Sequence, residues 1–168
     1  NVRIGDPYCE KVLDGSNDKY LVEQGVYPAS AIQYPNGKTT GIVSVFQTKP
    51  ASYNWQVSDF KIDNPDNMVI YELLFRDFTQ TGSELATGTI KEATKNLDYI
   101  KSLGVNAIEL MPIQEFDGNN SWGYNPCYYF AMDKAYGTKE EYKQFIDECH
   151  KQGIAVLLDV VYNHATGS

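Results

Sequence analysis

The second half of this chain alternates apolar runs with amphipathic segments, and this alternation restricts its possible folds more than any other feature. Three runs are typical of strands covered on both faces: "MVIYELLF" from Met68, "VNAIELMP" from Val105 and "IAVLLDVV" from Ile154. A segment with helical spacing of apolar residues lies in each of the two intervals. This order predicts right-handed βαβ units and a parallel sheet, and therefore the α/β class.

Both helical segments carry start and stop signals. Each begins with the spacing of a capping box and ends with a glycine directly before the next strand. These signals are Thr89, Glu92 and Gly104 in the first segment, and Thr138, Glu141 and Gly153 in the second. The apolar residues at helical spacing are Ile90, Ala93, Leu97 and Ile100, and then Tyr142, Phe145, Ile146 and Cys149. We therefore expect one continuous helix in each interval.

The first 66 residues have a different texture. They contain five of the seven prolines, with short patterned runs between turns. We expect a linker with one or two short strands over residues 1–66, and the strand and helix units over residues 67–168.

Composition excludes several classes of partner. The chain has 22 acidic and 14 basic residues and no Lys/Arg cluster, so we expect no nucleic-acid partner. No apolar stretch reaches the 18 or so residues of a membrane span, so we expect no membrane association. The three cysteines are an odd number without C-x-x-C spacing, which favours buried or free thiols over zinc ligands or a disulfide scaffold. The sequence predicts no compartment.

Parallel α/β sheets bind ligands at the carboxyl ends of their strands, and polar residues follow all three predicted strands. Arg76 and Asp77 follow the first strand, where a surface ion pair is expected. Strand alternation places Asp159 in the sheet interior, where a buried carboxylate needs a partner such as an arginine. Asn163 offers an oxygen suited to calcium, and His164 an imidazole that can bond a hydroxyl, although an Asn-His pair alone is more often a plain turn.

A long loop, "PIQEFDGNNSWGYNPCYYF", follows the second strand. It mixes aromatic rings, including Trp122 and Tyr124, with amides and carboxylates, and the whole chain holds 13 tyrosines among its aromatic residues. Such rings stack on sugars and hydrogen-bond hydroxyls, but they could equally pack down over the sheet.

Other acidic residues are poor candidates for catalysis. Glu72 and Glu109 lie inside apolar strands, where satisfied core carboxylates are expected. Glu115 and Asp117 form an acidic pair in the long loop with no strand to fix them. The sequence has no Ser/His/Asp set, phosphate-binding glycine loop or GxGxxG turn.

"DVVYNH", residues 159–164, resembles the first conserved region of the α-amylase family of glycoside hydrolases, at the end of the third strand of its (β/α)8 barrel. Three more stretches resemble that family's first strand, its second strand and loop, and its second helix with third strand. They are "VIYELLFRDFT", "GVNAIELMPIQEFDGNNSWGYNP" and "AYGTKEEYKQFIDECHKQGIAVLLDVVYNH". "IGDPYCEKVLDG" is similar to the exit from a β-sandwich domain that precedes the barrel in branching and debranching members.

The resemblance implies a partial TIM (β/α)8 barrel, with strands 1 to 3 and their helices, in a retaining glycosidase acting on starch, glycogen or maltodextrin. Tyr124 and His164 match residues that stack on and hydrogen-bond the sugar, and Trp122 lies beside them as a further substrate contact. Asn163 matches a calcium ligand, so calcium is the only cofactor implied. Asp159 matches an aspartate that supports the catalytic centre.

The family's catalytic Asp, Glu and Asp lie on strands four, five and seven, whereas this sequence ends after strand three. We therefore expect an N-terminal portion of the barrel with no catalytic residue of its own, inactive alone and prone to self-association through exposed strand edges. A non-catalytic sugar-binding or interaction module is the first alternative. A different parallel α/β enzyme is the second.

Overall fold

The computed structural model describes residues 4–80 and 88–166. Contacts divide the chain into two compact units. Unit 1 consists of residues 1–50, 112–135 and 160–168, and unit 2 of residues 51–111 and 136–159. Residues 112–135 pack in the same unit as residues 1–50, whereas the sequence predicts a boundary between residues 66 and 67. That domain boundary stays a prediction.

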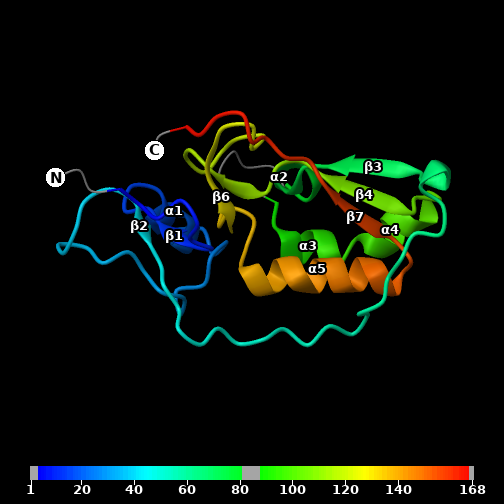
Figure 1. The fold of residues 1–168 in the computed structure, drawn as a ribbon, viewed down its shortest axis with the longest axis horizontal. Coiled ribbons are helices and arrows are strands. Elements are labelled where there is room, and N and C mark those ends of the chain that lie inside the picture. Colours follow the sequence, from blue (N-terminus) through cyan, green and yellow to red (C-terminus); the bar gives the residue numbers. More distant parts are fainter. Residues whose placement is uncertain (1–3, 81–87, 167–168) are drawn as a thin grey trace. The chain divides into compact units, whose positions relative to one another are not determined.

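Unit 2 contains the predicted parallel sheet (Figure 1). Strands β3 (Ile70–Leu73), β4 (Ala107–Leu110) and β7 (Ala155–Leu158) pair in the order β3-β4-β7, and both pairings are parallel. Each strand lies within one of the three apolar runs. The α/β class and the parallel sheet are therefore confirmed.

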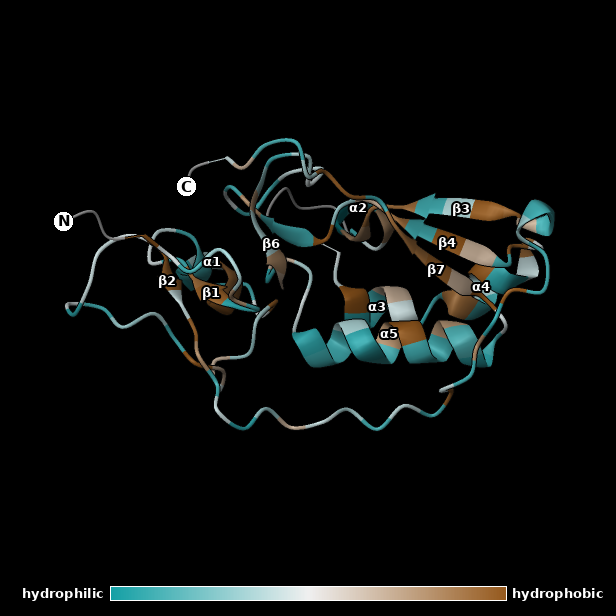
Figure 2. Cartoon of the chain, viewed as in Figure 1, coloured by the Kyte–Doolittle hydropathy of each residue, from teal (hydrophilic) through white to brown (hydrophobic). Residues whose placement is uncertain are grey.

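Helix α5 (Lys139–Lys151) forms as the sequence predicts. The Thr138 hydroxyl accepts from the Glu141 N–H, and the Glu141 carboxylate accepts from the Thr138 N–H, which completes the capping box. The helix ends before Gly153, whose φ of 71° favours glycine. Figure 2 shows α5 as largely hydrophilic, and its few buried side chains include Phe145 and Cys149.

The first predicted helix is not continuous, so that prediction was wrong. Residues 90–102 form two helices, α3 (Ile90–Thr94) and α4 (Leu97–Ser102). The Asn96 amide donates to the Glu92 carbonyl at 2.9 Å, a side-chain bond that competes with the helical backbone. The capping box is also half formed, since the Thr89 hydroxyl accepts from Glu92 N–H while the Glu92 carboxylate accepts from Lys95.

Coverage of the sheet on both faces was also predicted wrongly. Ile70 is 47% exposed and Glu72 is exposed, whereas Ile108 and Leu110, which point to the other face, are fully buried. Glu109 pairs in register with Glu72 and is half-buried. Glu72 is therefore not a core carboxylate. The reason is that β3 is an edge strand of the three-stranded sheet, and the described residues leave this face uncovered around Ile70 and Glu72, although Ala107 and Ala155 on the same face are buried.

Phe75 centres the aromatic core of unit 2. It begins helix α2 (Phe75–Phe78) and is 2% exposed. Its ring centroid lies 5.7 Å from that of Tyr136, 6.2 Å from Tyr142 and 5.2 Å from Phe145. These rings connect the end of β3 to α5, because edge-to-face aromatic packing adds to the burial of apolar area.

The extended segment 51–64, which precedes helix η1 (Pro65–Asn67), is tied to α5 by Asp147. The Asp147 carboxylate accepts from the N–H groups of Gln56 and Val57 at 3.0–3.1 Å and from the Tyr53 hydroxyl at 3.3 Å. Burial acts to raise the pKa of Asp147, but the bonds from these N–H groups outweigh it and lower the pKa. Sequence reasoning missed this contact, because nothing in "FIDECH" distinguishes Asp147 from a surface aspartate.

Unit 1 is built from short elements. Strands β1 (Val12–Leu13) and β2 (Val43–Ser44) form one antiparallel pair, and β5 (Gln114–Phe116) and β6 (Pro126–Met132) form another. Helix α1 (Asp18–Glu23) lies between β1 and β2 in sequence. A small core gathers residues from both strand pairs: Cys9, Val12, Cys127, Tyr128 and Ala131.

All three cysteines are buried free thiols, as predicted. Among the helices of the described residues, none is long and apolar enough to cross a membrane.

Candidate functional site

The loop of residues 117–125 connects β5 to β6 and holds its own shape. At its base, Asp117 N–H donates to the Asn125 carbonyl at 3.2 Å. Within it, the Ser121 hydroxyl contacts the Asn125 amide oxygen and accepts from the Gly123 N–H at 3.0 Å. We call residues 117–125 the aromatic loop, because they carry Trp122 and Tyr124.

Trp122 and Tyr124 extend into solvent from the aromatic loop. Trp122 is 61% exposed and Tyr124 is 38% exposed. By contrast, Tyr128 on β6 is buried in the core of unit 1. The sequence left two roles open for these rings, stacking on a sugar or packing against the protein. Tyr128 packs inward, while the rings of Trp122 and Tyr124 are accessible to a ligand.

His164 lies beside Tyr124. The His164 Nε2 is 2.9 Å from the Tyr124 carbonyl oxygen, and the His164 carbonyl accepts from the Tyr129 hydroxyl at 2.7 Å. Because a carbonyl oxygen only accepts, Nε2 carries the proton, and in the neutral ring Nδ1 is then an acceptor. Thr166 N–H also donates to the Pro126 carbonyl at 2.7 Å. The structure thus brings Tyr124 and His164, 40 residues apart, into one place.

Asn163 is exposed next to His164. Among the described residues there is no group of three or more His, Cys, Asp or Glu side chains that could hold a metal ion. Asn163 is one oxygen donor, and calcium binding at this position stays a prediction.

Asp159 belongs to unit 2, directly after β7. Its N–H donates to the Leu110 carbonyl at 2.9 Å, and its side chain is half-buried. The prediction that Asp159 is buried in the sheet interior was wrong, because the face to which this side of β7 belongs is open in this chain. The predicted arginine partner stays a prediction.

Arg76 and Asp77 form the surface ion pair that the sequence predicts, with Arg76 Nε 2.6 Å from Asp77 Oδ1. Hydrogen bonding by Arg76 lowers the pKa of the Asp77 carboxyl.

A buried charged cluster stands at the base of the aromatic loop, and sequence reasoning missed it. Lys134 follows β6, is 4% exposed, and forms ion pairs with Glu115 of β5 and with Asp18 of α1, the latter at 3.4 Å. The adjacent Asp133 accepts from the N–H groups of Phe116 at 3.0 Å and Ala135 at 2.7 Å. The expectation that no strand fixes Glu115 was therefore wrong. A lysine inside "FAMDKAYG" is the signal that could have suggested its burial.

The cluster holds three carboxyl groups and one ammonium group. Burial, reinforced by the charge of Asp133, raises the pKa of Glu115 to about 8 even though Lys134 favours its ionised form. Burial also raises the pKa of Asp133 to about 6 and that of Asp18. The three carboxyls together hold the pKa of Lys134 above its usual value against the effect of burial. Glu115 Oε2 is buried with no hydrogen-bond partner in the described part of the chain.

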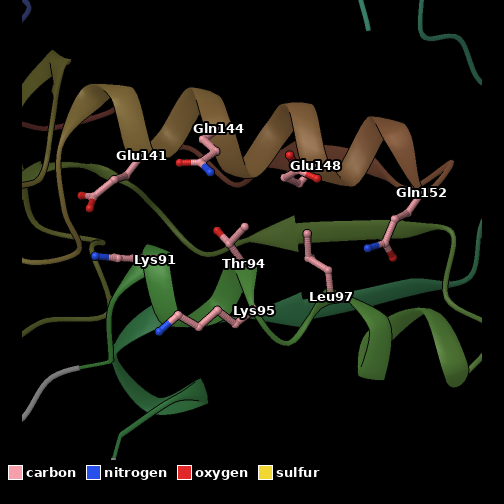
Figure 3. A pocket seen from close by; sticks show the side chains of 8 residues that line it. All are labelled: Lys91, Thr94, Lys95, Leu97, Glu141, Gln144, Glu148 and Gln152. Carbon is pink, nitrogen blue, oxygen red and sulfur yellow. The ribbon is translucent and has the colours of Figure 1, made fainter. Parts of the chain in front are cut away.

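A pocket in unit 2 lies between α3 and α5 (Figure 3). Its lining has no aromatic ring and none of the predicted sugar-binding residues, so it is a poor candidate for stacking a sugar. The lining residues are Lys91, Thr94, Lys95, Leu97, Glu141, Gln144, Glu148 and Gln152.

Gly123 gives a test of how strictly the aromatic loop is shaped. Its φ is 91°, and an added Cβ would lie 2.4 Å from the Pro112 carbonyl oxygen. We expect Gly123→Ala to destabilise unit 1 by about 2–3 kcal/mol, from backbone strain plus overpacking. Gly118→Ala is the matched control, since Gly118 has φ 79° but open space around it, and should cost only about 1 kcal/mol. Urea unfolding of the Trp55→Phe chain, followed by Trp122 fluorescence, measures both costs, and equal costs would contradict the clash.

Comparison with known proteins decides the family. A family model described as the α-amylase catalytic domain matches residues 35–168. The chain belongs to the α-amylase family. The match starts earlier than the 67–168 region where the sequence motifs of that family are found.

Relatives in the α-amylase family act on different glucosidic compounds according to their names. Malto-oligosyltrehalose trehalohydrolase of Saccharolobus solfataricus is 35% identical over 164 residues, which are 98% of this chain and 26% of that protein. The 1,4-alpha-glucan-branching enzyme of Yarrowia lipolytica is 42% identical over 167 residues, 97% of this chain and 24% of that protein. This chain therefore spans about a quarter of the length of these relatives.

A solved structure in the α-amylase family has the same fold over this region. The GBS pullulanase SAP, crystallised with maltotetraose, superimposes with a TM-score of 0.67 at 27% identity. The match covers 98% of this chain and 23% of the pullulanase. Both units of this chain therefore have counterparts in a longer family member.

Proposed function

We propose that this chain is part of a retaining glycosidase that hydrolyses or transfers α-glucosidic bonds in starch, glycogen or maltodextrin. Membership of the α-amylase family supports this proposal. The observation that carries it is the hydrogen bond from the His164 imidazole to the Tyr124 backbone carbonyl, which brings two residues with exposed side chains together in unit 1. The maltotetraose bound to the pullulanase neighbour is a ligand of the same chemical class.

Each site residue has a distinct role in this proposal. Tyr124 stacks on a glucose ring, and Trp122 supplies a second aromatic surface beside it. His164 accepts from a sugar hydroxyl through Nδ1, because its Nε2 proton is committed to the Tyr124 carbonyl. Asp159 supports the catalytic centre from the end of β7. Asn163 offers one oxygen to a calcium ion, but calcium takes no step in the proposed reaction.

The chain by itself is proposed to be catalytically silent, as part of a (β/α)8 barrel with the first three strands. Retaining hydrolysis needs two carboxyl groups about 5–5.5 Å apart across the glucosidic bond. Glu115 is buried against Lys134 and cannot face a sugar, while Asp117 is exposed. The nucleophile and the acid/base therefore come from polypeptide outside these residues. The open sheet face around Ile70 supports self-association as a further part of the proposal.

A non-catalytic sugar-binding module is the second candidate. One observation favours it: Trp122, Tyr124 and His164 all belong to unit 1, and the hydrogen bond between His164 and Tyr124 is made within that unit. Such a module would bind glucan without the rest of a barrel.

Calorimetric titration with maltoheptaose and hydrolysis of a chromogenic maltoside test the two candidates. We expect no hydrolysis and weak or no binding by the 168-residue chain. A fusion of these residues to the remaining part of the Saccharolobus solfataricus relative should hydrolyse the chromogenic maltoside and bind maltoheptaose. In that fusion, Tyr124→Ala or His164→Ala should weaken binding about tenfold or more, corresponding to about 1.4 kcal/mol per lost contact.

Tyr99→Ala is the matched control, because Tyr99 is an exposed tyrosine on α4, away from the aromatic loop in sequence and in the other unit. Hydrolysis by the chain alone would refute its catalytic silence. Tight binding by the chain alone would favour the module. If the fusion folds and its affinity for maltoheptaose is unchanged by Tyr124→Ala and by His164→Ala, the proposed site is refuted.

A further inference from the structure

The β5 and β6 strands that carry the aromatic loop are a weak support when taken alone. They pair at only a few positions, with register shifts between Gln114 and Glu115 and between Glu115 and Phe116. An isolated two-stranded hairpin is marginally stable in water. The position of the loop therefore depends on what else in unit 1 holds it.

The N-terminal segment supplies that support at two points. The Asn119 amide, within the aromatic loop, donates to the Asn17 carbonyl at 2.9 Å. At the base of the loop, buried Lys134 joins Glu115 of β5 to Asp18 of α1. Because Asn17 and Asp18 are consecutive, a single short segment contacts both the loop and the strands beneath it.

That segment is itself rigidly built. The Asp14 N–H donates to Asp18 Oδ2 at 2.9 Å, and the Asn17 amide donates to Asp14 Oδ2 at 2.7 Å. Asp14 also accepts from the Ser16 N–H at 2.7 Å, and Leu21 on α1 is 1% exposed. The turn of residues 14–18 is therefore held at both ends, by a hydrogen-bonded ring and by a buried helix.

We propose that Asn17 and Asp18 position the aromatic loop, and through it Tyr124 and Trp122, for stacking on sugar. This inference rests on the proposed function for what the loop binds. The physical reason is that a ring held in place pays less conformational entropy when a ligand binds than a ring that moves. Asn17, Asp18, Asn119 and Lys134 are positioning residues, since they touch the loop and its base rather than the sugar.

Trp122 reports directly on this positioning. The chain has two tryptophans, so Trp55→Phe leaves Trp122 as the single tryptophan, whose emission is followed with excitation that tyrosine does not absorb. Asn119→Asp removes the amide donor without changing the side-chain volume. In the Trp55→Phe background we expect it to increase both the acrylamide quenching constant of Trp122 and the rate of local anisotropy decay roughly twofold. Asp18→Asn should act in the same direction. Lys19→Ala, whose ammonium contacts the Tyr20 ring, is the matched control and should change neither signal.

Measurements well below the unfolding temperature separate positioning from general stability, because a merely structural role would lower the midpoint without freeing Trp122 in the folded chain. If Asp18→Asn does not fold, Asn119→Asp carries the test. Unchanged quenching and anisotropy in folded Asn119→Asp would overturn the proposal. The fluorescence measurement needs no ligand, so it is independent of the proposed function. If Asn119→Asp frees Trp122 but the fusion does not bind maltoheptaose, the positioning role is upheld and the proposed function is rejected.

Discussion

Lys134→Met is expected to destabilise unit 1 by about 3–5 kcal/mol at pH 8, the range observed when one partner of a buried ion pair is removed. Lys134 is the cation shared by Glu115 and Asp18, and the methionine leaves both carboxyls buried without it. The carboxyls can respond by taking up protons, so the cost should be smaller at pH 5. Urea unfolding of the Trp55→Phe chain, followed by Trp122 fluorescence, measures the change in the free energy of unfolding.

Lys151→Met is the control for removing a lysine from an ion pair. Lys151 is 2.7 Å from Glu148 on α5, but both side chains are more than a third exposed. Exposed pairs contribute about 0–1 kcal/mol, so this change should be close to silent. Equal effects of the two substitutions would show that Lys134 is not shielded from water in the way its 4% exposure indicates.

Rising pH is expected to destabilise unit 1 by roughly 3 kcal/mol between pH 5 and pH 8, at about 1.36 kcal/mol per pKa unit. Burial raises the pKa of Glu115 to about 8, against an ordinary value of 4.5 in the unfolded chain. The folded chain therefore keeps a proton that the unfolded chain has lost over this interval, so the free energy of unfolding falls as pH rises. Asp133, with a pKa raised to about 6, acts in the same direction.

Lys134 does not alter that sign below pH 10. Its pKa is raised, so the stability it contributes is fully present below its ordinary pKa of 10.5 and is lost only above it. Glu115→Gln should flatten the pH dependence, because the amide has no proton to lose in this range. Glu23→Gln, an exposed change on α1 in the same unit, should leave the dependence as it is. A stability that rises from pH 5 to pH 8 would contradict the raised carboxyl pKa values.

The regular parts of the fold follow from local signals. The capping box of Thr138 and Glu141 and the stop at Gly153 predict α5, because each signal satisfies backbone groups within one turn. The same signals were insufficient for the first helix, where Asn96 turns its amide back on the Glu92 carbonyl. Burial was the least predictable property, since Ile70 and Asp159 border a face that is open in this chain.

In the candidate site, too, some features could be predicted from sequence and others could not. The two motifs that contain Tyr124 and His164 could be recognised from sequence, and the structure places the two residues together. The contacts that hold the aromatic loop could not be predicted, because Asn17 and Asn119 are 102 positions apart and neither residue type signals its partner. Lys134 is similar: its burial depends on two carboxylates contributed by distant segments.

The composition of unit 1 from three separate stretches has a consequence for synthesis. When the first 50 residues leave the ribosome, the Asn119 amide and the Lys134 ammonium that complete their contacts have not yet been translated. Contacts of such sequence separation slow folding, because the intervening chain must first be closed into a loop. Asn17 lies 102 residues before Asn119, and Asp18 lies still further before Lys134, so a nascent chain arrested before Lys134 would expose Asp18 to water instead of burying it.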